Sequence, residues 1–240
     1  MRHADAVPLP GRLYKFLEAR WADSLINEGV VRCSSLAWFQ NFEDDEDGER
    51  SDPFEGKRKY LPIGGLPIQK AGTPLPGLLP NQSFQSAVRE CNRVFIFSTS
   101  LEAAPDVANR FRRPTDREMA SVEIRDPVRL RHGSGRPWAG SPVQQRTFFS
   151  SVVSYYPFEE PPLAKWALPH RIVMHKEKRF EHQCEYRFVF ATRRHAFDAN
   201  AVDTVLVGKD HRRPRPVLDP AEHCRDIRLG SLADICRRVR

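Results

Sequence analysis

Residues 183–187 carry the side chains of this sequence that are best suited to chemistry. Gln183, Glu185 and Arg187 alternate with a cysteine and a tyrosine at the start of an apolar segment. On a strand, alternate side chains point to the same face, so the amide, the carboxylate and the guanidinium would lie together. A carboxylate held ionised there suits stabilisation of an oxocarbenium-like sugar cation, or hydrogen bonding to a ribose hydroxyl. The alternative is an ordinary half-exposed strand with a weak Glu185–Arg187 ion pair.

Two further segments place polar side chains on apolar strands. Tyr14 and Lys15 could stack on a ring and bind a pyrophosphate, or they could be a core aromatic and an exposed cation. Ser98, Thr99 and Ser100 end a buried strand, where hydroxyl residues also occur simply as caps. Each segment is weak evidence alone, but their order along the chain favours one shared site.

An α+β fold with mixed or antiparallel split sheets, and with helices near both ends, is predicted to position these segments. Apolar residues at helical spacing predict helices over residues 17–27 and 231–239, and a helical turn or two is predicted over residues 83–90. The sequence lacks the regular strand–helix alternation of a doubly wound parallel sheet. Strands are predicted over residues 13–17, 30–34, 93–98, 119–124, 128–130, 147–156, 171–175, 184–191 and 202–207.

The length of 240 residues suits a single domain over residues 1–240. Residues 43–82 form an expected insertion or loop, acidic at first and then rich in Pro and Gly, with room for a small hairpin. A long loop in a compact domain usually serves as a lid, a binding loop or a mobile insertion.

Composition indicates a cytoplasmic protein without membrane association. No apolar run approaches the roughly 18 residues of a membrane span, and the five scattered cysteines are expected to be reduced thiols. The net charge of +7 is uneven: residues 1–120 hold 16 Lys and Arg against 17 Asp and Glu, whereas residues 121–240 hold 22 against 14. The basic half could attract nucleic acid or an acidic partner, or it could be a solvated basic face. Nothing in the sequence indicates the oligomeric state.

Several common site motifs are absent. The sequence contains no phosphate-binding Gly-rich loop, no dinucleotide-binding glycine motif and no Gly-x-Ser-x-Gly elbow. The acidic run over residues 43–49 lacks the bidentate Glu of a calcium loop, because Phe54 stands at its twelfth position, so no metal site is expected there. A metal-dependent nuclease using Asp52, Glu55 and Glu185 stays open as a third possibility, provided that these carboxylates meet.

The order of the three segments resembles the ADP-ribosyltransferase superfamily, in which a late strand carries a catalytic Glu, often as Gln-x-Glu. The resemblance implies an ADP-ribosyltransferase-like fold and NAD as substrate. It implies that Glu185 is the catalytic glutamate, that Gln183 orients the acceptor nucleophile, and that Ser98 and Ser100 shape the nicotinamide pocket. Tyr14, Lys15, Thr99 and Arg187 complete the expected NAD-binding set, with Lys15 standing where that superfamily has Arg or His.

The chain is also similar to a bacterial family of unknown function, from about residue 13 to beyond residue 208. That family opens with Leu-Tyr-Lys-Tyr, continues with an Asn-Asp-Pro-Phe-Glu segment, and closes with Glu-x-Glu-Tyr-Arg. Similar segments here are residues 13–16, 33–34, 39–41, 52–55, 97–98, 153–155 and 183–187. This resemblance implies a role in bacterial conflict or phage defence.

These observations give three hypotheses. The first is an ADP-ribosyltransferase-like enzyme, a glycosyltransferase or toxin that transfers ADP-ribose from NAD to a protein or nucleic-acid acceptor. The second is a non-enzymatic module that binds nucleic acid or protein through the basic residues 121–240. The third is the metal-dependent nuclease.

Overall fold

The computed structural model describes residues 9–41, 52, 54–70, 73–80, 82–103, 118–132, 148–161, 163, 167–193, 195–208 and 223–239. Its helical elements are α1 (Ala19–Asp23), the π-helical turn η1 (Ser24–Glu28), α2 (Leu36–Asn41), α4 (Pro127–His132), α5 (Pro169–Ile172) and the 3-10 helix η4 (Lys178–Gln183). Its strands are β1 (Leu13–Glu18), β2 (Val30–Ser35), β3 (Lys57–Tyr60), β4 (Leu66–Lys70), β5 (Thr73–Leu79), β6 (Gln82–Val88), β7 (Val94–Ser100), β8 (Met119–Ile124), β9 (Phe148–Val152), β10 (Ser154–Tyr156), β11 (His175–Glu177), β12 (Glu185–Ala191), β13 (Val202–Gly208), β14 (Cys224–Arg228) and β15 (Cys236–Val239).

Among the described residues, the main sheet has eight strands and is built around β7. Its strands follow the order β14-β2-β7-β1-β8-β15, and β12 pairs with β7 and with β9. All of these pairings are antiparallel. The α+β class with mostly antiparallel strands is therefore confirmed.

The main sheet forks along one edge of β7. On the other edge, β12 pairs with the whole strand, from Ser100 to Val94. On the forked edge, β2 pairs at Phe95 and Ile96, whereas β1 pairs at Ser100. The two strands therefore leave β7 at different points, and the middle of β7 lies at the fork.

Apolar side chains cover both faces of β7 and β12. Phe95, Phe97, Tyr186 and Phe188 belong to one core cluster, which also includes residues from β1, β2, β8 and the C-terminal segment. Ile96 and Val189 belong to a second cluster, with α5 and α2 residues. The alternation of clusters along each strand follows the two-residue period of strand side chains.

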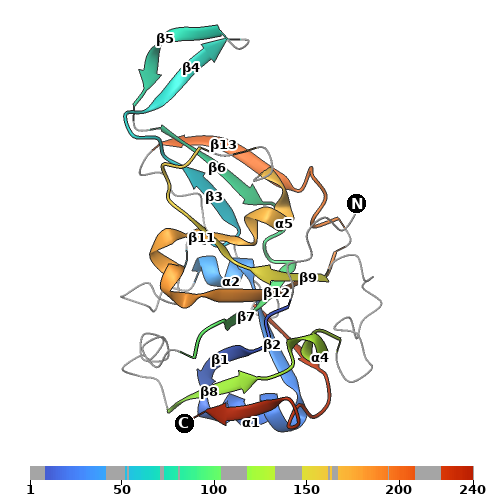
Figure 1. Cartoon of the computed structure of the whole chain (residues 1–240). Coiled ribbons are helices and arrows are strands. Elements are labelled where there is room, and N and C mark those ends of the chain that lie inside the picture. The colour runs from blue at the N-terminus through green and yellow to red at the C-terminus, as the bar shows by residue number, and fades with distance from the viewer. Residues whose placement is uncertain are drawn as a thin grey trace.

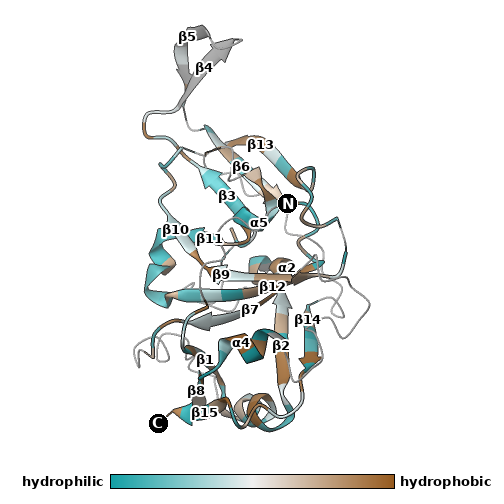
Figure 2. Cartoon of the chain, turned by 45° about the vertical axis from the view of Figure 1, so that its right-hand side comes forward, coloured by the Kyte–Doolittle hydropathy of each residue, from teal (hydrophilic) through white to brown (hydrophobic). Residues whose placement is uncertain are grey.

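Smaller sheets lie above β12 and β7 of the main sheet in the view of Figure 1. β13, β6 and β3 form a three-stranded antiparallel sheet, in which β3 is visibly hydrophilic (Figure 2). β10 and β11 form a parallel two-stranded ribbon. The β4–β5 hairpin pairs with itself and projects from the top of the molecule in Figure 1.

The predicted C-terminal helix over residues 231–239 is wrong. Leu232 and Ile235 are both buried, but they belong to one turn, in which the Ile235 and Cys236 amides donate to the Leu232 carbonyl. The chain then continues as β15 and pairs with the edge of β8. The three-residue spacing of apolar residues fits such a turn as well as it fits a helix. The prediction of helices near both ends of the chain is therefore met only near the N-terminus, by α1 and η1.

Three shorter predictions are also wrong. Residues 83–90 were expected to be helical, but residues 83–88 belong to β6, which buries Ser83 and Gln85 and leaves Phe84 42% exposed. Residues 128–130 form part of α4 rather than a strand, because Pro127 begins the helix and the Asp126 carboxylate accepts a hydrogen bond from a first-turn amide. Residues 171–175 contain the end of α5 and the start of β11.

The expected insertion over residues 43–82 includes β3 and the β4–β5 hairpin, while its acidic run 43–49 lies outside the described residues. Within the part of the chain that is described, no helix is long and apolar enough to cross a membrane.

Candidate active site

A cleft of about 290 Å³ opens at the fork of the main sheet. β1 forms one wall, β2 and α2 contribute to the other, and the polar end of β7 forms part of the floor. Every residue predicted for the site except Arg187 lines this cleft: Tyr14, Lys15, Ser98, Thr99, Ser100, Gln183 and Glu185. The three segments thus meet in one cleft, although 171 positions separate Tyr14 from Glu185 in the sequence.

The register between β7 and β12 sets the floor of the cleft. Glu185 pairs with Ser100, and Arg187 pairs with Ser98. Paired residues of neighbouring strands point to the same face, so these four side chains share one face of the sheet. The predicted common face of Glu185 and Arg187 is confirmed, since both side chains meet there in an ion pair. Thr99 donates to the Tyr186 carbonyl at 2.9 Å.

Gln183 reaches the site from outside the strand. The predicted strand over residues 184–191 begins at Glu185, because Gln183 ends η4 and Cys184 adopts a left-handed conformation with φ of 43°. Gln183 and Glu185 nevertheless converge, because both accept hydrogen bonds from the Lys176 ammonium, at 2.7 and 3.2 Å.

The Glu185 carboxylate lies between two cations. Its Oε1 accepts from Nε of Arg187 at 2.7 Å, and its Oε2 accepts from Nη2 of Arg187 at 3.0 Å. Burial alone would raise the pKa of the Glu185 carboxyl. The positive charges of Arg187 and Lys176, together with hydrogen bonds from Arg187 and Ser98, outweigh this effect and lower the pKa below its ordinary value. Glu185 is therefore an ionised carboxylate, although only 4% of the residue is exposed.

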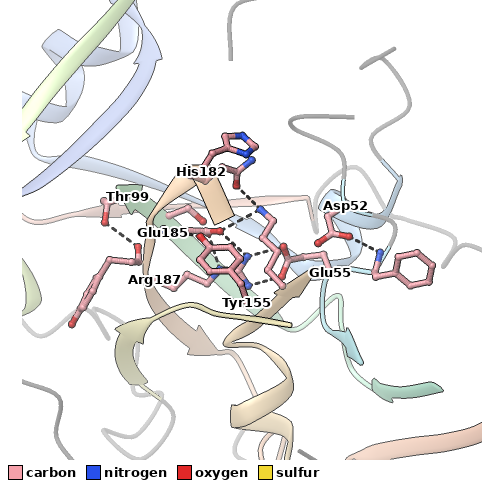
Figure 3. Close-up of polar contacts among 12 residues, drawn as sticks. Asp52, Glu55, Thr99, Tyr155, His182, Glu185 and Arg187 are labelled. Atoms are coloured by element: carbon pink, nitrogen blue, oxygen red, sulfur yellow. Dashed lines mark hydrogen bonds and ion pairs between the residues drawn. The ribbon is translucent and has the colours of Figure 1, made fainter. Parts of the chain in front are cut away.

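Arg187 contacts Glu185 but is not among the residues that line the cleft. Its guanidinium forms a bidentate pair with Glu55, at 2.6 and 2.8 Å, and also donates to the Val173 carbonyl at 2.6 Å. Figure 3 shows Arg187 between Glu185 and Glu55. Because the residue is only 1% exposed, its contacts orient Glu185 rather than reach a molecule in the cleft.

Glu55 and Asp52 come from the segment expected to be a surface insertion. Burial raises the pKa of both carboxyls, against the positive charges of Arg187 and Lys176. The Gln40 amide donates to the Glu55 carbonyl at 2.6 Å and fixes the turn. Sequence reasoning included Glu55 only as a metal ligand, since 132 positions separate it from Arg187.

The arrangement of these carboxylates gives no support to the metal-dependent nuclease. Glu55 and Glu185 turn their oxygens toward the same guanidinium, which occupies the space between them. Among the described residues, no group of three or more His, Cys, Asp and Glu side chains is placed to hold a metal ion.

Lys176 and Tyr155 were not predicted as site residues. Lys176 lies in a basic stretch that resembles exposed surface in the sequence, yet it is only 9% exposed and lines the cleft. The Tyr155 hydroxyl accepts a hydrogen bond from the Glu185 amide at 2.9 Å. Tyr155 ends the segment 153–155, one of those similar to the bacterial family, and this similarity was a usable signal. The sequence contains no such signal for Lys176.

Lys15 crosses the fork of the sheet. Its ammonium donates to the Ser98 carbonyl at 2.7 Å and lies 4.9 Å from the centre of the Phe97 ring. The lysine thereby bonds a β7 carbonyl where β1 and β2 diverge, and it places positive charge in the cleft.

Comparison of the chain with protein-family models, curated proteins and solved structures finds no match.

The cleft combines an ionised carboxylate with aromatic and cationic walls. Tyr14, Trp21 and Trp38 line it, and the Arg32 guanidinium lies 4.3 Å from the centre of the Trp21 ring. Aromatic rings bind planar groups, cations bind phosphates, and a carboxylate accepts hydrogen bonds from hydroxyls or stabilises positive charge. A nucleotide-like molecule presents all three partners.

Proposed function

We propose that the chain is an ADP-ribosyltransferase-like enzyme that cleaves NAD and transfers ADP-ribose to a protein or nucleic-acid acceptor in the cytoplasm. The observation that carries the proposal is the ionised, doubly paired Glu185 in a cleft that Lys15, Ser98 and Gln183 also line. The fork of the sheet at β7 supports the split-sheet fold expected for such an enzyme.

The charge of Glu185 suits the bond that must break. When the bond between the nicotinamide nitrogen and the ribose carbon cleaves, its electron pair leaves with nicotinamide and positive charge develops on the ribose. A fixed carboxylate stabilises that charge more in the transition state than in the ground state, which accelerates cleavage. The acceptor nucleophile then bonds to the same ribose carbon and releases its proton. Gln183, beside Glu185, is positioned to orient that nucleophile.

Release of nicotinamide from NAD by the purified protein tests the proposal. Glu185→Gln keeps the size of the side chain and removes its charge, so turnover should fall by at least about 100-fold. Glu123→Gln is the matched control, since Glu123 is also a buried carboxylate paired with two arginines, Arg12 and Arg237, but does not line the cleft. Turnover in the control should remain within about twofold.

Loss of folding must be separated from loss of chemistry. Circular dichroism and the thermal midpoint of each variant establish that it is folded. Ser98→Leu provides a second route, because it fills the cleft and leaves the ion pairs of Glu185 in place; it should raise the KM for NAD. Absence of nicotinamide release by the wild-type protein, or full activity of both cleft variants, would contradict the proposal.

The same variants distinguish the enzyme from the basic binding module. A module that binds nucleic acid through residues 121–240 would show steeply salt-dependent binding to oligonucleotides. Such binding would be unchanged by Glu185→Gln. A role in bacterial conflict or phage defence is the biological setting that the family resemblance favours for the enzyme.

A further inference from the structure

The β10–β11 ribbon lies beside Glu185, and the charge of its Lys176 acts both on Glu185 and on Glu55. Within this parallel ribbon, Tyr155 and Lys176 are register partners. The Tyr155 hydroxyl accepts from the Glu185 backbone amide at 2.9 Å, and the Lys176 ammonium donates to the Glu185 carboxylate at 3.2 Å. One ribbon thus holds both the backbone and the side chain of the proposed catalytic residue.

Lys176 also holds Gln183, on the other side of a strained residue. Cys184 separates Gln183 from Glu185 and has a φ of 43°, which non-glycine residues rarely adopt and which the surrounding structure must enforce. The Lys176 ammonium bonds the side chains on both sides of Cys184, at 2.7 Å to Gln183. An ammonium has three donors and no acceptor, so it fixes the Gln183 carbonyl oxygen toward itself.

The surroundings of Lys176 restrict its movement. The residue is 9% exposed, and its ammonium lies 4.6 Å from the centre of the Phe180 ring. The charged and titratable groups that face Glu185 are Arg187 from its own strand, Lys176 and Tyr155 from the ribbon, and Glu55 from the turn before β3. Arg187 donates hydrogen bonds to both Glu55 and Glu185. The Lys176 ammonium donates to Gln183 and Glu185, while its charge also acts on Glu55 and Asp52.

We propose that Lys176 is a positioning residue of the active site, which sets the orientation of Gln183 and keeps the Glu185 carboxylate charged and aimed into the cleft. This inference rests on the proposed NAD-cleaving function for its kinetic consequence. Its electrostatic consequence, a change in the pKa of the Glu185 carboxyl when Lys176 is replaced, is independent of that function.

The kinetic test compares Lys176→Met and Lys176→Arg with the wild-type protein. Lys176→Met removes the ammonium and keeps the stem, so kcat for nicotinamide release should fall about 100-fold, the scale expected for a misplaced catalytic group. KM should change by less than about threefold, and Lys176→Arg should recover part of the loss. Lys178→Met is the control, since Lys178 is an exposed lysine two positions further along.

A pH profile separates positioning from a merely structural role. Removing a cation beside Glu185 raises the pKa of its carboxyl, so the acid limb of the Lys176→Met profile should move to higher pH. A structural role would lower activity at every pH without moving that limb. An unmoved limb, or equal losses in Lys176→Met and Lys178→Met, would overturn the proposal.

A third measurement distinguishes this inference from the proposed function. Carbon-13 NMR of the glutamate carboxyls, assigned with Glu185→Gln, should show Glu185 titrating at higher pH in Lys176→Met than in the wild-type protein. If the wild-type protein cleaves no NAD but this shift occurs, the proposed function fails and the positioning role stands. If NAD is cleaved and the Glu185 signal is unchanged by Lys176→Met, the positioning role fails alone.

Discussion

At the scale of single residues, Arg187 organises the site. A guanidinium has five N–H donors, and those of Arg187 meet Glu185, Glu55 and the Val173 carbonyl in five hydrogen bonds. Because its guanidinium makes these five hydrogen bonds within the protein, Arg187 can be buried with only 1% of the residue exposed. Burying charges is costly, and the geometry must be close to ideal to offset that cost. The pairing therefore fixes Glu185 more firmly than an exposed ion pair would.

Arg187→Met should lower the free energy of unfolding by about 3–5 kcal/mol, because it leaves two buried carboxylates without their main partner. Urea denaturation at neutral pH measures the change. Arg89→Met is the matched control, since Arg89 pairs with Asp203 on the surface with both side chains at least 40% exposed; its loss should stay below about 1 kcal/mol. Equal losses in the two variants would show that the buried pairing has no special stabilising effect.

The lowered pKa of Glu185 predicts a pH dependence of stability. A carboxyl whose pKa is lower in the folded than in the unfolded protein, where it is about 4.3, stabilises the fold above that pH. The stabilisation is lost as the pH falls from that value through the folded pKa. Glu185→Gln should therefore lose less stability than the wild-type protein between pH 5 and about pH 3, measured by urea denaturation.

Glu55 and Asp52 act in the opposite direction, because burial raises the pKa of each carboxyl in the folded protein. Both residues remain in the Glu185→Gln variant, but the charge of Glu185 contributes to the raised pKa of Glu55, so the difference between the two curves reports on Glu185 together with its effect on Glu55. Parallel curves for the two proteins would contradict an unusually acidic Glu185.

At the scale of elements, the sequence predicted strands well where burial is two-sided. The apolar runs of β7 and β12 are buried on both faces, and both strands were expected close to their observed bounds. β6 escaped prediction because it buries Ser83 and Gln85 and exposes Phe84, the reverse of the usual pattern. Tertiary contacts decide such a strand, and a single sequence does not contain them.

The residues of the candidate site also divide into those that the sequence pattern indicates and those that depend on tertiary contacts. Glu185 and Ser98, which line the cleft, could be predicted as site residues because each stands at one end of an apolar run. Lys176 was missed because its burial depends on the parallel pairing of β10 with β11, which brings together positions about twenty residues apart. Arg187 was expected to contact NAD, but its partner Glu55 comes from a segment whose composition resembles a loop.

The C-terminal segment depends on a close approach to the end of η1. Gly29 ends η1 with φ of 64°, and a Cβ at this position would lie 1.8 Å from the Gly230 carbonyl oxygen. The Gly29 carbonyl also accepts from the Leu229 amide at 2.9 Å. These contacts hold the chain that leads into residues 231–239 against the end of η1.

Gly29→Ala should therefore lower the free energy of unfolding by about 3 kcal/mol or more, from backbone strain and the clash together. Gly64→Ala separates the two effects, because Gly64 also has a positive φ, of 84°, but nothing lies within 4 Å of its added Cβ. Gly64→Ala should lower the free energy of unfolding by only about 1–2 kcal/mol. Chemical denaturation measures both, and equal losses would contradict the packing of the C-terminal segment against Gly29.

At the scale of the whole molecule, the cleft depends on segments from most of the chain. β1 and β2 diverge from β7, β12 carries Glu185, and the β10–β11 ribbon and the turn before β3 hold Glu185 in place. The predicted insertion over residues 43–82 therefore has two unlike parts. Its Glu55 belongs to the support of the site, whereas its β4–β5 hairpin pairs with itself and projects from the body (Figure 1).

Excision of the hairpin should leave the rest of the molecule intact. Tyr60 of β3 pairs with Phe84 of β6 in an antiparallel register, so replacing residues 63–81 with Asn-Gly joins the two strands by a two-residue turn. The thermal midpoint should change by less than about 4 °C, the shift that about 1 kcal/mol produces in a chain of this size. A larger loss, with unchanged expression and monodispersity, would show that the hairpin stabilises the body. Because the described residues of the excised segment do not line the cleft, nicotinamide release should also persist. Its loss would assign the hairpin a part in binding NAD or the acceptor.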